Sequence, residues 1–466
     1  MILKELLNHR TYKTRNMQKM RRYIFIAILL VTTYIAKAQP EVTLPYMHNV
    51  FQASFVNPTI MPEHTFSTGF SVFGQAISNG FQPTNFMSYR TDTMYVNLNS
   101  LLGDMNDKNM IYLAQNADLF HIRAKVLSSY FWFAIRQNSS VTLQYPSDLF
   151  RVAIEGNQPF VGSSIDLSNL KSDISFYNEY TIGYLKDLPR WTFAGRISIL
   201  QGLANLNFNP DVLKVEIDTA FAHTGVADAR MRTAGLPHNA DGDINFDGVD
   251  DQWALNKFSS FANKGFAISG GATFKYDERL NLSFSFYDLG FIKWKTDVQT
   301  YTLKGQSSFS GFDILSDLLA GNDFDVDSVL QDMEDDFTRD TISSSYTTWL
   351  NPKFNFTANY QLARRTMVGV TFAAFVNRRF YPSVSIGISQ GVGRFFQVVG
   401  TASVYQRSIP NLGVGLVFKP GPFQFFVVAD NLRPIAKPLS FTNANVRVGL
   451  NLVFGRVYQP QGLPYK

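Results

Sequence analysis

Long segments in which apolar and polar side chains alternate residue by residue limit the fold of this 466-residue chain more than any other feature. In KFNFTANYQL (353–362), for example, Phe354 and Phe356 fall on one face and Asn355 and Thr357 on the other. This period of two is typical of β-strands with one apolar and one polar face. The alternation recurs in LFHIRAKV (119–126), WTFAGRISI (191–199), GFAISGGATFKY (265–276), NLGVGLVF (411–418) and NVRVGLNLVF (445–454).

Short turn sequences at 186–189, 277–279, 363–365 and 419–421 join neighbouring strands, which indicates an antiparallel meander. A secreted β-sandwich or propeller would show the same alternation. These strands, however, match the ~9–11 residues that cross a bilayer and exceed the ~5–6 usual in sandwiches. We therefore expect an all-β fold, a transmembrane antiparallel β-barrel over residues 65–456. Roughly 12 to 16 strands can be marked in this range, and we expect short helices in its long loops.

The N-terminus has the order of residues found in secretory signal peptides. Lys19, Arg21 and Arg22 precede the apolar run YIFIAILLVTTYI (23–35), and small residues follow before Gln39. A membrane anchor is the alternative, but the run is shorter than the ~20 apolar residues that span a bilayer. We expect residues 1–38 to be a cleaved signal peptide and the barrel to lie in the bacterial outer membrane, in contact with lipid.

Removal of residues 1–38 changes the charge balance. Eight of the 42 Lys and Arg residues and one of the 37 Asp and Glu residues lie there, which leaves 34 basic and 36 acidic residues. No nucleic-acid partner is therefore expected. The chain has no cysteine, and after residue 38 no stretch approaches the ~18 apolar residues of a membrane helix. Stability must come from packing or from a closed sheet.

The polar face of the predicted strands carries charge that a water-filled lumen would solvate. We predict that six residues line this lumen: His121, Arg123, Lys125, Arg196, Lys353 and Arg447. Aromatic residues near strand ends are expected to form the girdles at the two membrane interfaces. These aromatic residues include Trp191, Tyr276, Trp294, Phe380, Tyr381, Phe395 and Phe396.

Two terminal segments flank the predicted barrel. Residues 39–64 are expected to form a periplasmic or lumen-entering segment, and residues 457–466 a C-terminal tail. A receptor with a large plug domain is disfavoured, because too little chain remains for such a domain.

Near the C-terminus, RVGLNLVF (447–454) resembles the last strand that the outer-membrane insertion machinery recognises in bacterial barrels, although twelve residues follow its final Phe. Several blocks resemble, in order, an uncharacterised outer-membrane barrel family of Bacteroidetes, a domain of unknown function. These blocks are SFVNPTIMPEH (54–64), YNEYTIGYLKDL (177–188), residues 264–297, residues 409–434 and NANVRVGLNLVFG (443–455).

That family is similar in outline to the long-chain fatty-acid transporter (FadL-like) barrels, with about fourteen strands. It is also distantly similar to the PorP/SprF-type barrels that accompany type IX secretion and gliding machinery. The resemblance implies a barrel over almost the whole mature chain. One departure is Thr59, where the family has a small residue after Asn-Pro.

The stretch DGDINFDGVDDQ (241–252) resembles a calcium-binding loop. Asp243, Asn245, Asp247 and Asp251 occupy positions 1, 3, 5 and 9 of such a loop, where oxygen ligands converge on one ion. Position 12 is Ala254 rather than the bidentate Glu of an EF-hand. Calcium is therefore the one cofactor considered, and a solvated acidic loop is the alternative. The residues that follow, 251–262, are predicted to form a short helix.

A second acidic insertion, residues 312–345, contains ten acidic residues and one Arg. Leucine, valine and methionine recur within it at spacings of three and four, which predicts one or two amphipathic helices. A solvated cap is one interpretation, and a surface that docks an envelope protein or attracts cations is the other.

Catalytic motifs are absent from the sequence: it has no GxSxG, HExxH or Walker loop, and no two histidines of the mature chain have metal-ligand spacing. We therefore do not expect an enzyme. The first functional hypothesis is a channel or transporter for a small or amphiphilic solute. The alternative is a structural or docking component of an envelope or secretion machine that uses the acidic loops as contacts.

Overall fold

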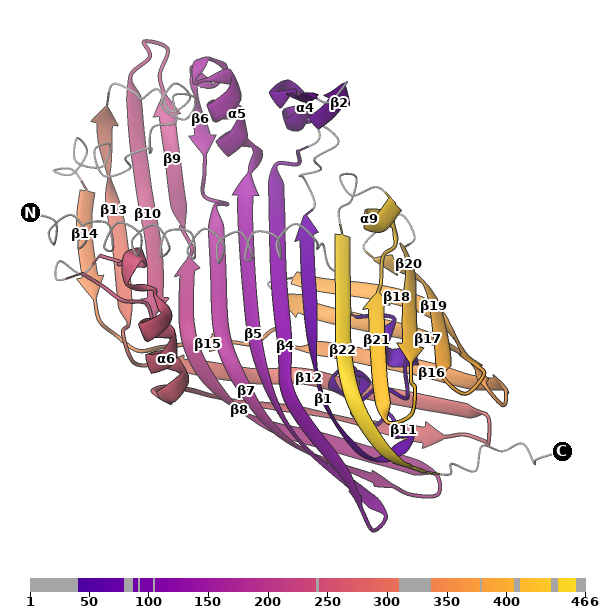
Figure 1. Ribbon diagram of the computed structural model, residues 1–466. Coiled ribbons are helices and arrows are strands. Elements are labelled where there is room, and N and C mark those ends of the chain that lie inside the picture. The colour runs from indigo at the N-terminus through magenta and orange to yellow at the C-terminus, as the bar shows by residue number, and fades with distance from the viewer. Residues whose placement is uncertain are drawn as a thin grey trace, which may run out of the picture.

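The computed structural model describes residues 41–78, 87–90, 93–103, 105–239, 243–309, 337–377, 379–405, 411–436 and 443–457. The predicted signal peptide, residues 1–38, and the tail after residue 457 lie outside these described residues. Within them, one continuous antiparallel sheet dominates the structure (Figure 1).

A closed barrel of fourteen strands forms the body of the described chain. Each strand pairs antiparallel with the next in the order β1 (His64–Ser78), β4 (Lys108–Val126), β5 (Ser129–Pro146), β7 (Lys171–Asp187), β8 (Trp191–Phe208), β11 (Asn263–Lys275), β12 (Leu280–Trp294), β16 (Lys353–Ala363), β17 (Thr366–Asn377), β18 (Arg379–Val392), β19 (Phe396–Tyr405), β20 (Asn411–Phe418), β21 (Phe423–Ala429) and β22 (Asn443–Arg456). The ring closes because β1 pairs with β4 on one side and with β22 on the other, with His64 opposite Arg456. The predicted antiparallel barrel of about 14 strands is confirmed.

The connections give the barrel two different ends. At the short-turn end, β1 begins, β22 ends, and tight turns join β4 to β5, β7 to β8, β11 to β12, β16 to β17, β18 to β19 and β20 to β21. The four turns predicted from sequence are among them. Most connections at the opposite, long-loop end are long. They carry β2 (Met87–Arg90), β3 (Thr93–Val96), α4 (Leu98–Gly103), α5 (Ser147–Glu155), η2 (Gln158–Phe160), η3 (Phe246–Gly248), α6 (Asp251–Ser259), β15 (Tyr346–Trp349) and α9 (Arg433–Ala436).

One wall of the barrel is taller than the other. β4, β5 and β8 have 19, 18 and 18 residues, whereas β20 and β21 have 8 and 7. The tall wall continues beyond the ring as an extension sheet (upper left in Figure 1). In this sheet β6 (Ser163–Asp166), β9 (Val212–Ile217), β10 (His223–Ala234), β13 (Gln299–Phe309) and β14 (Phe337–Ile342) pair in that order.

The outer surface of the ring is apolar around the whole barrel. Each strand exposes large apolar side chains at alternate positions, for example Phe70, Ile122, Phe131, Ile182, Ile197, Phe266, Phe284, Phe356, Phe372, Ile386, Val398, Leu416, Phe425 and Val448. The same strands turn polar groups inward: Arg136, Arg196 and Arg447 are each 5 % exposed or less. An outer apolar band around a polar interior is the distribution that a lipid-facing barrel requires. Among the described helices, none has both the length and the apolar character to cross a bilayer.

One residue predicted for the aromatic girdles lies elsewhere. Trp191, Tyr276, Phe395 and Phe396 are exposed at the short-turn end, whereas the side chains of Phe380 and Tyr381 are outside the described set. Trp294 is fully buried, and its Nε1 donates to Thr348 Oγ1 at 2.8 Å. The prediction for Trp294 was wrong because a β-bulge in β12, described below, reverses which positions face outward.

One helix that was predicted from the sequence is present in the long loops. α6 confirms the helix predicted within residues 251–262. In the second acidic insertion, residues 312–336 lie outside the described residues, so the helices predicted there stay predictions. The described residues that follow them form β14.

Candidate functional site in the barrel lumen

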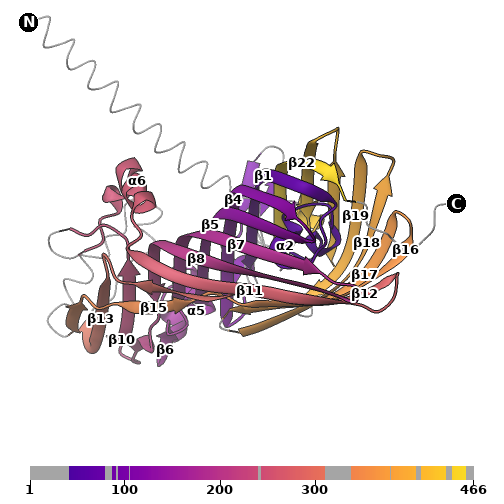
Figure 2. The same cartoon turned by 90° about the horizontal axis from the view of Figure 1, so that it is seen from below.

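Residues 41–63, which we call the lumen segment, lie inside the barrel (Figure 2). The segment contains η1 (Leu44–Tyr46) and α2 (Ala53–Val56). Its polar groups bond to strands all around the ring: Thr43 to Thr401, Tyr46 to Ser385, Asn49 to Gln424, Gln52 to Asn451, Phe55 to Arg196, Val56 to Ser285 and Asn355, and Thr59 to Thr273. Only a segment within the ring reaches so many strands.

Apolar packing also holds the lumen segment. Leu44, Met47 and Val50 are fully buried in a core with inward-facing residues of the short wall, Val399, Val417, Phe426 and Val428. Phe51 and Phe55 pack on the opposite side against Tyr130, Trp132 and Leu185. The segment therefore fills the middle of the lumen. From the sequence, we expected this space to hold water.

Glycines in the wall make room for this packing. A Cβ atom added at Gly387 would lie 2.7 Å from two atoms of the Tyr46 ring, and one at Gly415 would lie 2.7 Å from Met47 Sδ. Real Cβ contacts are not that short, so a larger residue at either position would displace the segment or the strand.

A chain of ion pairs links the start of the segment to the tall wall. Arg447 Nε donates to Glu41 Oε1 at 2.7 Å, and Arg447 Nη1 donates to Asp118 Oδ2 at 2.5 Å. Asp118 also accepts from Arg136 Nε at 2.8 Å, and Arg136 Nη1 lies 3.4 Å from Glu179 Oε2. The residues of this ion-pair series that lie on strands are almost fully buried. The stability of each charged group therefore depends on its ion-pair partners.

A β-bulge builds a second charged group. Ile268 pairs with Leu289 and Gly270 with Phe286, so Tyr287 and Asp288 together lie opposite one residue of β11. Asp288 adopts φ 60°, a conformation that few residues other than glycine tolerate. Its carboxylate accepts from Lys353 Nζ at 2.5 Å and lies 3.4 Å from Arg196 Nη2. The bulge thereby turns two consecutive side chains into the lumen.

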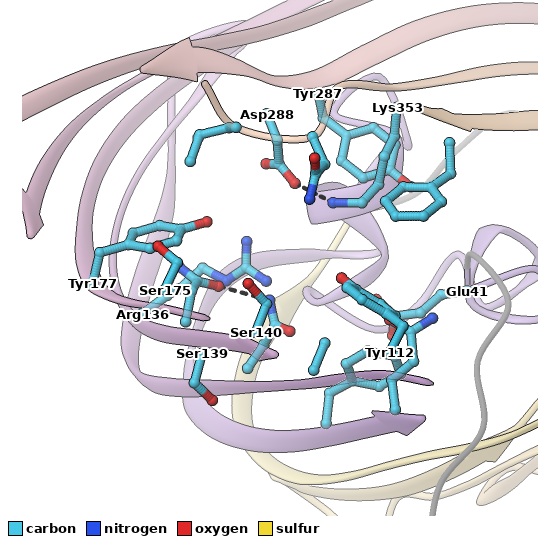
Figure 3. A pocket seen from close by; sticks show the side chains of 18 of the residues that line it. Glu41, Tyr112, Arg136, Ser139, Ser140, Ser175, Tyr177, Tyr287, Asp288 and Lys353 are labelled. Atoms are coloured by element: carbon cyan, nitrogen blue, oxygen red, sulfur yellow. Dashed lines mark hydrogen bonds and ion pairs between the residues drawn. The ribbon is translucent and has the colours of Figure 1, made fainter. Parts of the chain in front are cut away.

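These two charged groups border a cavity of about 120 Å³ on the long-loop side of the lumen segment, which we call the outer cavity. Figure 3 shows Asp288 and Lys353 on one side of it, Arg136 and Tyr177 on another, and Tyr112 near Glu41 on a third. Phe55 and Val56 of the segment also line it. Its lining mixes aromatic rings, amides and paired charges, a combination suited to a ligand with both apolar and polar parts.

Comparison with models of known protein families gives a match over most of the chain. The model of a family of unknown function, DUF5723, matches residues 58–430. The chain belongs to the DUF5723 family. The sequence-based expectation of a family of unknown function is thereby confirmed, whereas an origin in Bacteroidetes and a likeness to PorP/SprF-type barrels stay predictions. No curated protein matches the sequence of this DUF5723 chain.

Solved structures similar to this DUF5723 chain include three bacterial barrels. The toluene transporter TbuX of Ralstonia pickettii is 8 % identical with a TM-score of 0.44, and the P. putida toluene transporter TodX is 9 % identical with a TM-score of 0.42. A FadL homologue of Pseudomonas aeruginosa is 9 % identical with a TM-score of 0.43. Each similarity covers 87 % of this chain and 94 % of the other. Likenesses at this level do not identify a solute.

The six predicted lumen residues lie in different surroundings in this structure. Arg196, Lys353 and Arg447 take part in the ion pairs described above. His121 stacks on the Phe51 ring with centroids 3.7 Å apart, and Arg123 lies 5.0 Å from the same ring, both nearly fully buried. Lys125 is exposed beside the β4–β5 turn, with Nζ 5.9 Å from the Tyr130 ring.

Five charged residues of the site were not predicted from the sequence: Glu41, Asp118, Arg136, Glu179 and Asp288. Arg136 was detectable, because it continues the even-numbered inward face of YFWFAIRQN (130–138). Asp118 was not, because it adjoins a bulge in β4, and Asp288 was not, because it lies in the bulge of β12. In β4 the extra residue is Leu119, and both Leu119 and Phe120 face outward.

The four predicted calcium ligands lie near α6. Asn245 Oδ1 accepts from the Gly248 amide at 3.0 Å, and Asp250, not a predicted ligand, caps α6 by accepting from the Trp253 amide at 2.8 Å. Asp243, Asp247 and Asp251 are exposed. In the described part of the chain, no three His, Cys, Asp or Glu side chains gather into a group that would hold a metal ion. Calcium binding here stays a prediction.

Proposed function

We propose that the protein is an outer-membrane channel for a small amphiphilic solute and that the lumen segment is its gate. The observation that carries the proposal is the outer cavity, whose lining includes Phe55 and Val56 of the segment. A solute bound there contacts both the barrel wall and the lumen segment. The segment is attached to the ring covalently at residue 64 and otherwise by noncovalent contacts, such as its hydrogen bonds to the strands. Displacement of that segment would open the lumen.

The outer apolar surface of the ring supports the proposed membrane location, since every strand of the ring exposes apolar side chains that could contact lipid. We propose that the long loops face the outside and the short turns the periplasm, with β22 presenting the strand read by the insertion machinery. The test is electrophoresis of the purified mature protein in detergent without boiling. A folded barrel should run faster than the boiled chain and should fractionate with the outer membrane. Recovery as a freely soluble periplasmic protein would contradict this location.

A disulfide tether tests the gate directly. Thr43 Oγ1 of the segment lies 2.7 Å from Thr401 Oγ1 of β19, close enough for a pair of cysteines. The chain has no cysteine, so Thr43→Cys with Thr401→Cys supplies the only two thiols. The probes are benzenesulfonate and benzyltrimethylammonium, two permanently charged amphiphiles of opposite sign. In vesicles, we expect oxidation of this pair to stop the flux of whichever probe the reduced protein passes. Reduction should restore the flux.

A matched control comes from the wall itself. Thr357 of β16 and Thr371 of β17 are cross-strand partners inside the barrel, with their Oγ1 atoms 3.1 Å apart. A cysteine pair there ties wall to wall and leaves the segment untethered, so oxidation should not change flux. If the oxidised Thr43–Thr401 tether still passes a probe that the reduced protein passes, the segment is not the gate. If the untethered protein passes neither probe, the channel proposal fails.

The extension sheet favours a second candidate, a docking component of an envelope machine. Its outermost described strand, β14, is exposed along nearly its whole length and lies within the second acidic insertion. An exposed strand edge is a common site for pairing with another chain. Co-purification of one defined envelope protein, lost when residues 337–342 carry a proline, would favour docking over transport.

A further inference from the structure

A second cavity, of about 420 Å³, lies at the short-turn end of the lumen. The lumen segment contributes His48, Asn49 and Glu63 to its lining, and the turns after β16, β18 and β20 supply the opposite side. This inner cavity and the outer cavity therefore lie on opposite faces of the lumen segment. A solute that crosses the lumen must pass from one to the other.

The inner cavity is strongly cationic. Among the described residues that line it, five carry positive charge and only Glu63 is a carboxylate; the five are Arg364, Arg365, Arg394, Lys419 and Arg456. The outer cavity differs, because its three carboxylates outnumber its two cations: Glu41, Asp173 and Asp288 against Arg136 and Lys353. Low-dielectric walls concentrate the field of such a cluster, so an anion is attracted toward the short-turn end.

Three cations at this end contact neutral groups directly, although the Glu63 carboxylate also acts on the charge of Lys419. Lys419 Nζ donates to His64 Nε2 at 2.7 Å, and Arg365 Nη1 donates to the Gly393 carbonyl at 2.8 Å. Neither bond cancels the positive charge.

The third is Arg123, on β4 at the same end. It is 5 % exposed, its Nε has no hydrogen-bond partner, and within the described residues no carboxylate forms an ion pair with it. Arg123 does not line the inner cavity. A buried guanidinium without an anion is costly, and its charge adds to the positive potential at this end of the lumen.

We propose that the inner cavity binds an oxyanion, a carboxylate or a phosphate, either as a free anion or as the head group of an amphiphile. Guanidinium groups bind both anions through paired hydrogen bonds, and arginine is the main cation here. The inference deepens the proposed function, on which it rests, by naming the charge of the solute. Anion binding can be measured without measuring transport. A failure of the anion-site proposal can therefore be distinguished from a failure of the channel proposal.

The test is isothermal titration of the full mature protein in a non-ionic detergent at low, fixed ionic strength. The probes are sodium phosphate, sodium hexanoate and the neutral hexan-1-ol. We expect saturable binding of at least one anion and none of the alcohol. Phosphate binding as tight as hexanoate binding identifies a free oxyanion as the ligand, and tighter hexanoate binding identifies an anionic head group. Binding of hexan-1-ol as tight as that of the tighter-binding anion, or no saturable binding of either anion, overturns the proposal.

Charge-reversal variants locate the site. Arg394→Glu with Arg456→Glu should weaken anion binding by about tenfold or more, and Glu63→Gln should strengthen it. The matched control is Arg279→Glu, which reverses an exposed charge on the β11–β12 turn at the same end but outside the cavity lining. The control should change the affinity less than about twofold. All variants must keep the gel mobility of the folded barrel. Equal weakening by Arg279→Glu would show that the general charge of this end, not the cavity, attracts the anion and would overturn the proposal.

If the Thr43–Thr401 tether blocks flux while no anion binds, the gate stands and the anion site fails. If anions bind and the tether has no effect, the reverse holds.

Discussion

Arg447 donates from Nε and Nη2 to the two carboxylate oxygens of Glu41, at 2.7 and 3.2 Å, and so ties the first described residue of the chain to its last strand. Arg447 is fully buried and also holds Asp118. Glu41 is therefore one of two carboxylates that depend on a single guanidinium.

Replacement of Arg447 by Met should destabilise the barrel by roughly 3–5 kcal/mol, because Asp118 and Glu41 lose a buried partner. Glu41→Gln should cost much less, since Arg447 keeps Asp118 and an amide oxygen still accepts its hydrogen bond. Urea unfolding in detergent, followed by gel mobility, measures both. We also expect Glu41→Gln to raise basal flux in vesicles by loosening the lumen segment. Equal loss of stability in the two variants would contradict this account.

Gly387 and Tyr46 form a steric pair that a double-mutant cycle can test. Gly387→Ala forces a Cβ into the Tyr46 ring and should cost about 1–3 kcal/mol. Tyr46→Ala alone should cost about 3–5 kcal/mol through the cavity that it leaves. The double variant should be more stable than the sum of the two losses predicts, because the alanine at 387 no longer meets a ring. Strict additivity would mean that Tyr46 does not pack against β18.

Asp288 combines an unusual backbone conformation with a charge that holds two cations. Asp288→Asn keeps a residue that tolerates positive φ but loses the charge, whereas Asp288→Ala loses both. We expect Asp288→Ala to destabilise the barrel more than Asp288→Asn by about 1 kcal/mol. Thermal unfolding of the two variants gives this difference directly. If alanine is tolerated as well as asparagine, the bulge is not strained at this residue.

The β11–β12 turn should make stability depend on pH. Asp277 Oδ1 accepts from the amides of Arg279 and Leu280, both at 2.7 Å, and these bonds hold the pKa of the carboxyl below its usual value. A lowered folded pKa means that the stabilisation is present above the ordinary pKa of an aspartate and is lost as the pH falls through the lowered one. Asp277→Ala should therefore be less stable than the native chain at pH 7, and the two should converge in acid. Asp277→Asn, which keeps an acceptor, should show a weaker pH dependence.

Local periodicity predicted the strands, the tight turns and the inward direction of Arg196, Lys353 and Arg447. It failed where one extra residue reverses the alternation. Leu119 in β4 and the Tyr287–Asp288 pair in β12 are such places, and the second of them explains why Trp294 points inward. A bulge is set by pairing with the neighbouring strand, so one strand read alone does not reveal it.

Partners far apart in the sequence were also out of reach. Glu41 and Arg447 are 406 residues apart, and only the closed ring brings them together. Residues 39–64 contain no alternation that assigns them to the wall, so the sequence left their place open between the periplasm and the lumen. The exposed place of Lys125 depends on how far β4 extends past Arg123, which alternation does not specify.

The unequal height of the wall determines how a molecule approaches the long-loop end. β4 has twelve residues more than β21, about 40 Å of extended chain before tilt is considered. The strands of the ring therefore extend further on the tall side, where the extension sheet continues the wall, than on the side of β20 and β21 (Figure 1). In the proposed membrane location, a compound dissolved among lipid head groups would reach the side of β20 and β21 by sliding along the bilayer surface, whereas one arriving from bulk water above the tall side would first meet the extension sheet.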